Sequence, residues 1–483
     1  MGNYDKIKRA KYFARLISLG CIKATRSVQI KTDKSSFKKF VKNNKKLKYP
    51  YIILSTYGSK IDPLIMQRNL HYGSTYHVFN SNNGSKDYPI LKHMGRRYFN
   101  LYSDKVIRTI KEAIKRKLNV VIYPEKYVSL DGTTSQISPS IIHILKEVDR
   151  PVMVCVNHGT YNYAPVWRKA YKTGVVTSEM KELFTREDLA NSDEEELYNR
   201  LIRAMYYNEC AWLKKQNIVN IDKTRCEGLE NILYKCPGCL EENKMLAKGT
   251  KIHCLSCGKQ WVMTQYGDMI ATLDENENAT LHNWFKFQKD CVVEEISNRK
   301  YSFAGRVKVT VVNKDNYNIV DDKRASTVVG VMWHNCEGIV LKYNLGSKEE
   351  ELIINADKLN SIQINYDYND KDTCIEIPID DTIIKVRFNK DEISASKIMF
   401  VHEELYRKYR TLKKEDKLSV YKNDSTAITV NVEELLHGEE ELESIIENAG
   451  NVVAVEYVDD KEVTTSTADK IRQSAQTAHT DEV

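Results

Sequence analysis

Short apolar runs alternate with helical patterns in the first half of the chain, and this alternation predicts an α/β domain. Strands are expected at 51–54, 119–123 and 152–156, where apolar residues follow one another without a break. Helices are expected at 106–117, 140–148 and 194–215, where apolar residues recur every three or four positions. Strands that alternate with helices favour a sheet of parallel type.

From residue 307 to residue 388 the apolar period changes to two, which predicts a β-rich domain. Its strands are expected at 307–312, 327–333, 338–343, 351–356, 361–368, 373–379 and 382–388. Asp380 and Asp381 are suited to turn the last hairpin, and a helix is expected at 396–410. Seven strands followed by one helix resembles the element order of a pleckstrin-homology-like domain.

The first residues predict a basic amphipathic helix over 5–19. Its apolar arc is formed by Ile7, Ala10, Phe13, Ala14 and Ile17, and its basic arc by Lys8, Lys11 and Arg15. A second basic cluster, KKFVKNNKKLK, follows at 38–48. Two interpretations stay open: the helix docks on an anionic membrane surface, or it packs on its own domain.

Charge is unevenly distributed along the chain, although the whole carries a formal net charge of only +7. Residues 1–50 hold 15 Lys/Arg and 2 Asp/Glu, whereas residues 431–483 hold 3 Lys/Arg and 14 Asp/Glu. A basic head favours contact with anionic lipid or nucleic acid, and an acidic tail of this kind is typically solvated and disordered.

Composition fits a globular protein of several domains. The chain has 483 residues, of which 42% are hydrophobic and 29% charged, and about 150 residues per domain suggests about three domains. Its apolar runs fall far short of the ~20 residues that span a bilayer, and the first thirty residues lack the apolar core of a signal peptide. The expected location is the cytoplasm, peripheral at the inner face of the cell membrane.

Four of the 11 cysteines predict a zinc site. KCPGC carries Cys236 and Cys239, and HCLSCGKQW carries Cys254 and Cys257. Two residues between cysteines let one tight turn present both thiolates, and four thiolates fill the tetrahedral coordination of Zn²⁺. No coordination position is left for chemistry, so the predicted zinc is structural. Gly258 suits a turn that needs positive φ.

Four segments, in order and spacing, resemble the glycerolipid acyltransferases, the family that includes 1-acylglycerol-3-phosphate acyltransferase. They are YIILSTYGSKIDPLI (51–65), MGRRYF (94–99), VVIYPEKYVSLDG (120–132) and DRPVMVCVNHGTYNYAPVW (149–167). We refer to them as the first to fourth segments. Some bacterial members carry a four-cysteine ribbon after this domain, and GLENILYKCPGC resembles its start. The resemblance covers roughly residues 1–295 and implies an acyltransferase-like mixed sheet with flanking helices.

The resemblance implies transfer of an acyl group from an acyl thioester to the hydroxyl of a lysophospholipid. In the family, a histidine of the first segment is the general base, and an aspartate five residues later orients its imidazole. Here Asp62 matches the aspartate and Ser59 the motif serine, but Tyr57 stands at the histidine position. A phenol would need its pKa lowered by about three units, or ~4 kcal/mol, to act as a base at neutral pH. A nearby carboxylate such as Asp62 shifts it the other way.

The resemblance also implies binding residues for the acceptor's phosphate. Arg96, Arg97, Glu125 and Lys126 stand in the matching segments. The third segment keeps Pro-Glu but has Lys-Tyr-Val at 126–128 where the family has Gly-Thr-Arg, so the motif arginine is absent. Lysine supplies charge without the bidentate fork of arginine.

Other histidines were weighed as replacement bases. They are His71, His77, His93 and His158, of which His158, after a strand, is the best placed. A structural role is the alternative for each of them.

These observations predict the following organisation: a basic amphipathic region (1–48), an acyltransferase-like domain (49–230), a zinc ribbon (231–265), a helical connector (266–300), a β-rich domain with its helix (301–412) and an acidic tail (413–483). Two functions stay open. One is an acyltransferase acting on acyl thioester and lysophospholipid at an anionic membrane surface. The other is an inactive lipid- or partner-binding protein on the same fold. A nucleic-acid-binding ribbon is disfavoured, because basic and aromatic residues are not interleaved around the cysteines.

Overall fold

The computed structural model describes residues 7–8, 12–32, 50–70, 75–79, 90–97, 101–168, 174–313, 327–346, 348–358, 362–366, 373–379, 382–389 and 391–415. Residues 1–407 form one compact unit and residues 408–483 a second. The basic cluster at 38–48, the turn at Asp380 and Asp381 and the acidic stretch at 431–483 lie outside the described residues. The description below concerns the first unit.

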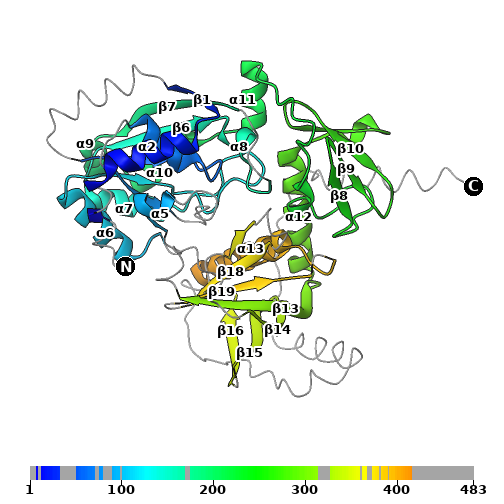
Figure 1. The fold of residues 1–483 in the computed structure, drawn as a ribbon. Helices are drawn as coiled ribbons and strands as arrows, with labels where there is room; N and C mark the ends of the chain where they lie inside the picture. Colours follow the sequence, from blue (N-terminus) through cyan, green and yellow to red (C-terminus); the bar gives the residue numbers. More distant parts are fainter. Residues whose placement is uncertain are drawn as a thin grey trace, which may run out of the picture. The chain divides into compact units, whose positions relative to one another are not determined.

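A seven-stranded mixed sheet forms the α/β domain (Figure 1). Its order is β1-β7-β6-β2-β5-β3-β4. The strands are β1 (Val28–Thr32), β2 (Ile52–Ser55), β3 (Thr75–Phe79), β4 (Gly95–Arg97), β5 (Asn119–Ile122), β6 (Val152–His158) and β7 (Gly174–Phe184). The three predicted strands became β2, β5 and β6, which are neighbours and parallel. Only the β6–β7 pair is antiparallel among the described pairs of this sheet.

Strand β7 was not predicted from the sequence, because polar residues on its buried side interrupt its apolar pattern. Ser178 is fully buried and donates a hydrogen bond to Asn157 Oδ1 at 2.6 Å. Asn69 donates to Ser178 at 2.8 Å. A buried polar position is tolerated when it is hydrogen-bonded, but it interrupts the alternation by which strands are recognised in a sequence.

Helices cover both faces of this sheet. They are α2 (Ala14–Ala24), α4 (Asp62–Asn69), α5 (Leu91–Met94), α6 (Asp104–Lys115), α7 (Ser140–Val148), α8 (Thr160–Tyr163), α9 (Arg186–Asn191), α10 (Glu194–Met205) and α11 (Glu209–Gln216). One core joins β2, β3, β5 and β6 to α6, α7 and α10, and a second joins α2, α4 and α5 to β1 and β7. The single helix expected over 194–215 is two helices, because Asn208 pairs with Thr133 and caps α11.

A five-stranded antiparallel sheet carries the cysteines, in the order β12-β11-β10-β9-β8. Its strands are β8 (Met245–Lys248), β9 (Lys251–Cys254), β10 (Gln260–Met263), β11 (Asp268–Ala271) and β12 (Ala279–Thr280), flanked by the short helices η1 (Leu229–Asn231) and η2 (Glu275–Glu277). The connector expected over 266–300 therefore contains one α-helix, α12 (Leu281–Ser297), besides the short η2. Residues 268–280 continue the ribbon sheet, since Met269 and Ala271 alternate inward as a strand requires.

The β-rich domain is a seven-stranded antiparallel sheet followed by one helix, α13 (Ala395–Glu415). Its strands are β13 (Ser302–Asn313), β14 (Thr327–Asn335), β15 (Gly338–Leu345), β16 (Lys348–Asn355), β17 (Gln363–Asn365), β18 (Cys374–Ile379) and β19 (Thr382–Arg387). The long strand β13 pairs with β14 along residues 302–310 and with β19 along residues 308–313. Both halves of the sheet share one core.

Helix α2 packs on the sheet through a narrower face than the sequence predicted. Ala14, Ile17 and Cys21 are buried, but Phe13, expected on the same apolar arc as Ala14 and Ile17, is 51% exposed. The burial follows the spacing i, i+3, i+7 from Ala14, and Phe13 falls outside this stripe. No helix among the described residues is long and apolar enough to cross a membrane.

Candidate functional site

The first segment turns from β2 into α4, and its two key residues are closed off from solvent. Tyr57 and Asp62 are both 0% exposed. Asp62 is the first residue of α4, with Pro63 behind it in the first turn, a favourable position for a carboxylate at a helix N-terminus. The Tyr57 backbone N–H donates to Glu125 Oε1 at 2.7 Å, which ties the first segment to the third.

The Asp62 carboxyl is only half satisfied by its neighbours. Its Oδ2 accepts hydrogen bonds from the Ser59 N–H at 2.7 Å and from Thr160 Oγ1 at 3.2 Å. Its Oδ1 is buried and has no hydrogen-bond partner. Burial raises the pKa of Asp62 well above its ordinary value, and the bonds from Ser59 and Thr160 only partly oppose this shift. One oxygen of this carboxyl is thus left unused.

Buried aromatic rings pack on one another around Tyr123, which lies near enough to Asp62 to feel its charge. The Tyr57 and Tyr123 rings lie 4.9 Å apart, and Tyr123 stacks on Phe79 at 5.3 Å. Burial, followed by the nearby Asp62, raises the pKa of Tyr123 well above its ordinary value, so this phenol keeps its proton. The site therefore holds the neutral phenol of Tyr123, which cannot act as a base.

The interactions of His77 and His158, two of the candidate replacement bases, are with residues other than Asp62. Burial lowers the pKa of His77 to about 3, and His77 Nδ1 lies 3.2 Å from the Tyr123 hydroxyl. The His158 ring stacks on Trp212 at 5.3 Å, with Glu179 as its nearest carboxylate, 3.7 Å from Nε2. His71 lies outside the described residues.

Glu125 holds the first and third segments together. Its Oε1 accepts from Tyr57 N–H and its Oε2 from Ser135 N–H, each at 2.7 Å. Burial raises the pKa of Glu125 to about 7, against the lowering effect of these two hydrogen bonds. Ser59 donates its hydroxyl to the Ala164 carbonyl. Both side chains therefore bind backbone of this domain, which fixes the loops around Asp62.

The other predicted phosphate ligands are differently placed. Lys126 Nζ lies 3.1 Å from Glu403 Oε1 of α13, and both side chains are about 15% exposed (14% and 15%). Arg96 and Arg97 stand on β4, opposite Val78 and Phe79 of β3. Their side chains lie outside the described part of the structure.

One carboxylate–imidazole pair was missed by the sequence analysis. His282 Nδ1 at the start of α12 lies 2.6 Å from Asp131 Oδ2. Thr133 holds the other Asp131 oxygen through its N–H and its hydroxyl. The hydrogen bond to Asp131 raises the pKa of His282. No local pattern pairs residues 151 positions apart, so only the fold reveals this contact.

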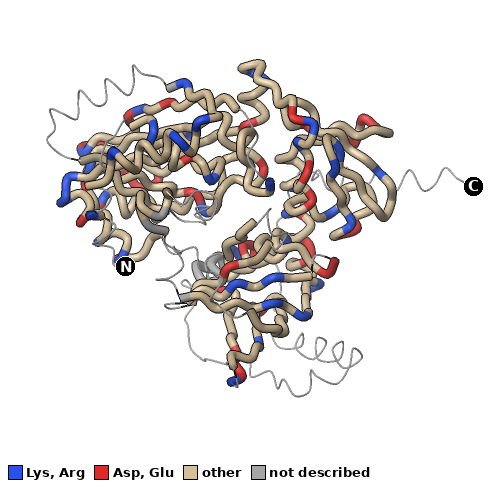
Figure 2. Tube along the Cα trace, in the orientation of Figure 1, with Lys and Arg blue, Asp and Glu red and all other residues tan. Residues whose placement is uncertain are grey.

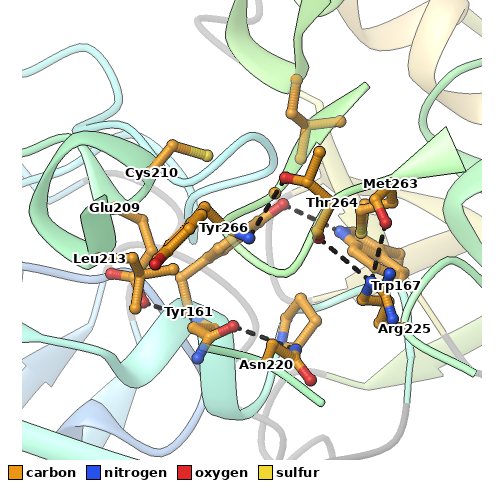
Figure 3. Close-up of a pocket in the computed structure, with 14 residues that line it drawn as sticks. Tyr161, Trp167, Glu209, Cys210, Leu213, Asn220, Arg225, Met263, Thr264 and Tyr266 are labelled. Carbon is orange, nitrogen blue, oxygen red and sulfur yellow. Dashed lines mark hydrogen bonds between the residues drawn. The ribbon is translucent and has the colours of Figure 1, made fainter. Parts of the chain in front are cut away.

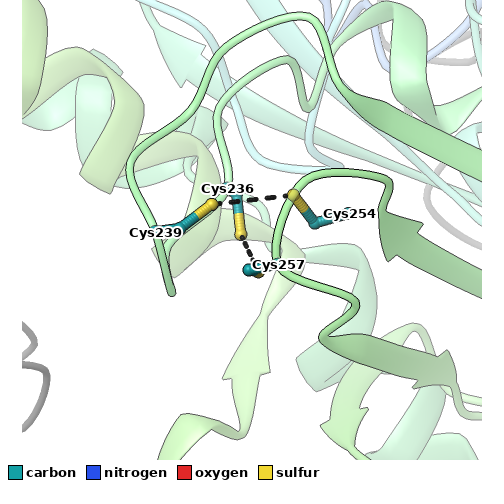
Figure 4. A group of neighbouring side chains, drawn as sticks. All are labelled: Cys236, Cys239, Cys254 and Cys257. Carbon is teal, nitrogen blue, oxygen red and sulfur yellow. Dashed lines mark hydrogen bonds between the residues drawn. The ribbon is translucent and has the colours of Figure 1, made fainter. Parts of the chain in front are cut away.

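The four cysteines converge on one point (Figure 4). All four Sγ atoms lie within 4.8 Å of one another, with Cys236 and Cys257 3.8 Å apart and Cys239 and Cys254 3.7 Å apart. A tetrahedron of Zn–S bonds of about 2.3 Å places sulfur atoms roughly 3.8 Å apart. Gly258 has φ 76°, as its turn requires. The cluster is compatible with a metal site.

A pocket lies between the fourth segment and the β10–β11 hairpin (Figure 3). Its lining includes Tyr161, Trp167, Glu209, Arg225 and Tyr266. Glu209 accepts hydrogen bonds from two backbone N–H groups and the Tyr207 hydroxyl, and Arg225 donates to backbone carbonyls. These polar groups bind protein atoms, and neither Tyr57 nor Asp62 lines the pocket.

Comparison with known proteins gives only weak structural likeness. No family model matches the chain, and no curated protein matches it by sequence. Among solved structures it is similar to the 1-acyl-sn-glycerophosphate (LPA) acyltransferase PlsC from Thermotoga maritima. The match has 17% sequence identity and a TM-score of 0.31, and it covers 40% of this chain and 78% of that chain. Such a TM-score is too low to establish a shared fold.

Proposed function

We propose that the α/β domain is an acyltransferase-like scaffold that binds a lysophospholipid or acyl lipid but lacks the general base needed for efficient transfer. The observation that carries this proposal is the buried Asp62 Oδ1 without a hydrogen-bond partner, in the same short segment as the buried Tyr57. A carboxylate that orients an imidazole uses one oxygen for that contact. Here Tyr57 stands in the imidazole's place, and the oxygen stays without a donor.

The direct test is Tyr57→His. Restoring an imidazole beside Asp62 is expected to raise acyl transfer from an acyl thioester to lysophosphatidate by at least about tenfold, because a general base typically contributes roughly 10²–10⁴-fold. The measurement is thioester release, followed with wild type and variant side by side.

The matched controls are Tyr57→Phe and the double variant Tyr57→His with Asp62→Asn. Tyr57→Phe should leave the low wild-type rate unchanged, and the double variant should lose the gain. A wild-type rate within tenfold of that of Tyr57→His would contradict the missing base and favour an active acyltransferase.

For the cysteine cluster we propose one structural Zn²⁺ per chain. The donor set supports it: four thiolates saturate the tetrahedral coordination, with sulfur spacings of 3.7 and 3.8 Å among them. Bound zinc would cross-link the two turns and stabilise the ribbon sheet. It would take no part in chemistry at Asp62.

We further propose that the protein associates peripherally with an anionic membrane in the cytoplasm. Helix α2 and its N-cap support this with the apolar side chains of Phe13 and Leu16, 51% and 61% exposed, and with Arg15 between them in the sequence. Lys and Arg positions are otherwise interspersed with Asp and Glu along the described chain (Figure 2). Apolar insertion together with basic side chains is the usual means by which interfacial helices bind anionic lipid.

Leu16→Asp tests this surface. It is expected to reduce co-sedimentation with vesicles of phosphatidylglycerol and phosphatidylcholine several-fold, because a carboxylate opposes both insertion and anionic lipid. The control, Leu273→Asp, changes an 85% exposed residue of the ribbon region and should bind as wild type does. Equal binding by wild type and Leu16→Asp would remove α2 from the proposal.

A further inference from the structure

The β-rich domain contacts the same segments that carry the acyltransferase resemblance. Lys60 of the first segment donates its ammonium to the Tyr366 carbonyl at 3.2 Å. Gln363 of β17 donates its amide to the Lys126 carbonyl in the third segment, also at 3.2 Å. Lys60, Gln363 and Tyr366 are all less than a tenth exposed. These contacts are therefore buried, which distinguishes them from incidental surface hydrogen bonds.

The two residues that depart from the family pattern at 126 and 127 are both used in this interface. Lys126 Nζ lies 3.1 Å from Glu403 Oε1. The Tyr127 hydroxyl accepts a hydrogen bond from Lys289 Nζ of α12 at 3.0 Å, and Lys289 also lies 3.5 Å from Glu403 Oε2. The Gly and Thr of the family pattern offer neither contact.

Glu403 is the centre of this cluster. Burial works to raise the pKa of its carboxyl, but Lys126 and Lys289 outweigh burial and hold the pKa below its ordinary value. The carboxylate is thus ionised and shared by two ammonium groups. Lys289 also lies 5.1 Å from the centre of the Phe400 ring, so α13 meets the cluster through a charged and an aromatic side chain.

A second ion cluster fixes the beginning of α13 independently of Glu403. Lys397 pairs with Glu242 at 2.9 Å and with Glu295 at 2.8 Å, and Lys235 pairs with the same two carboxylates. Two lysines and two glutamates balance in charge. Loss of Glu403 would consequently loosen the contact with the third segment while the start of α13 stays held to the ribbon and α12.

We propose that residues 362–366 and 395–407 form an intramolecular cover over the surface made by Lys60, Lys126 and Tyr127, and that Glu403 is the contact that keeps this cover closed. The covered surface belongs to the segments assigned above to lysophospholipid binding, and the identity of the ligand rests on that proposed function. The cover itself rests only on the contacts between its two sides.

A phosphate-bearing lipid is the kind of ligand that opens such a cover. It presents an anion that pairs with Lys126 and Lys289 in place of Glu403, so it binds the open state in preference to the closed state. A ligand shifts an equilibrium by its difference in affinity for the two states. Neutral lipids of the same chain length lack this difference and leave the cover closed.

The test is hydrogen–deuterium exchange on full-length Glu403→Gln. Leaving two partly buried ammonium groups without their shared carboxylate destabilises a local contact, so exchange in residues 122–135 and 362–366 should rise by roughly tenfold. Glu404→Gln is the matched control, because Glu404 pairs with Arg407 on its own helix. Exchange in α6 reports whether the fold as a whole is intact.

A second variant removes the other partner of the Lys126–Glu403 ion pair. Lys126→Met should raise exchange in 362–366 while α6 stays unchanged. Unchanged exchange at 122–135 and 362–366 in both variants would overturn the cover. An increase in exchange spread equally over the whole protein, α6 included, would overturn it as well. Exchange that rises equally in Glu404→Gln would likewise overturn the role of Glu403.

Lipid binding separates this proposal from the proposed function. Lysophosphatidate added to wild type should raise exchange at 362–366, and Glu403→Gln should bind lysophosphatidate vesicles several-fold more tightly than Glu404→Gln. Lysophosphatidylcholine, whose phosphate is screened by choline, should do neither. If exchange rises in Glu403→Gln but lysophosphatidate binding does not change, the cover stands and the lipid-binding function fails.

Discussion

The four-cysteine cluster and the Tyr57–Asp62 site both come from short sequence patterns, yet they differ in what makes them work. The cysteine cluster needs only its own two turns, because the sulfur atoms reach one another within the ribbon. What the Asp62 carboxyl can do depends on its neighbours, and the nearby Tyr123 belongs to a cluster of packed aromatic rings with Tyr57 and Phe79. The presence of the carboxylate alone therefore does not define what this site does.

The difference lies in where the interaction energy comes from. A metal site gathers its own ligands and gains a large binding free energy from each thiolate. An orienting carboxylate contributes only through the imidazole that it holds, and alone it is a buried polar group with a cost. The first kind of site is readable from spacing, and the second only from its surroundings.

The largest expected effect is at the cysteines. Cys236→Ser should abolish stoichiometric zinc and unfold the ribbon sheet, since structural zinc sites supply roughly 10–16 kcal/mol of binding free energy. Metal analysis of the purified protein and near-ultraviolet circular dichroism measure both. Cys336→Ser, outside the cluster, should keep one zinc per chain. If purified wild-type protein holds no metal, the cysteine cluster is not a metal site and its contrast with the Tyr57–Asp62 site is wrong.

An intermediate effect of opposite sign is expected at Asp62. Asp62→Asn should raise the free energy of unfolding at pH 8 by about 1–3 kcal/mol, because it removes a buried carboxyl with one unpaired oxygen. Denaturant unfolding measures the change. Ser59→Ala is the control that removes a nearby hydroxyl without touching this charge, and it should destabilise.

The pH dependence of that gain has a definite sign. The pKa of Asp62 is raised in the folded state, so the folded protein holds a proton that the unfolded chain releases above its ordinary pKa near 3.8. Wild type therefore loses stability from this group as the pH rises above that value. The gain from Asp62→Asn should shrink as the pH falls from 8 to 5. A gain independent of pH would mean that Asp62 carries no charge penalty.

The smallest effect is expected at the exposed imidazole. His282→Gln should lower stability by no more than ~0.5 kcal/mol at pH 6, because the side chain is 44% exposed and solvent screens its pair with Asp131. The raised pKa of His282 gives a contribution that is complete below about pH 6.5 and is lost as the pH rises through the folded-state value.

The same variant sharpens the comparison of the two sites. If wild type transfers acyl groups, His282→Gln should leave the rate unchanged, since this pair lies outside the first segment. A loss of activity in His282→Gln would move the reacting centre from Asp62 to Asp131 and His282. His143→Gln, on α7, serves as the control for removing a histidine.

Unbroken apolar runs and the period of apolar residues predicted part of the fold from the sequence. The central strands β2, β5 and β6 are unbroken apolar runs, and α7 begins and ends where its period predicts. The sequence pattern did not predict strand β7, because the polar residue Ser178 lies on its buried side. The sequence pattern did not predict strand β11 either, because an apolar alternation of only four residues is too short to stand out next to a long helix.

The site residues also differ in whether a local sequence pattern predicts them. The cysteines and Gly258 follow from local spacing, whereas the partner of Lys126 is Glu403, which no pattern links to the third segment. The departures at 126 and 127 looked like losses in the sequence. In the structure they make contacts with helices more than a hundred residues away, and those contacts arise only after three domains have folded.

Strand β13 also sets the order in which the protein can be completed during synthesis. Its first half finds a partner in β14 as soon as residue 335 has left the ribosome, but its second half waits for β19, where Lys308 meets Arg387. Until then the nascent chain presents a bare strand edge, the kind of surface that pairs with neighbouring chains. Any chain that stops before β19 keeps that edge permanently, so premature termination in this region yields a product for chaperones and proteases.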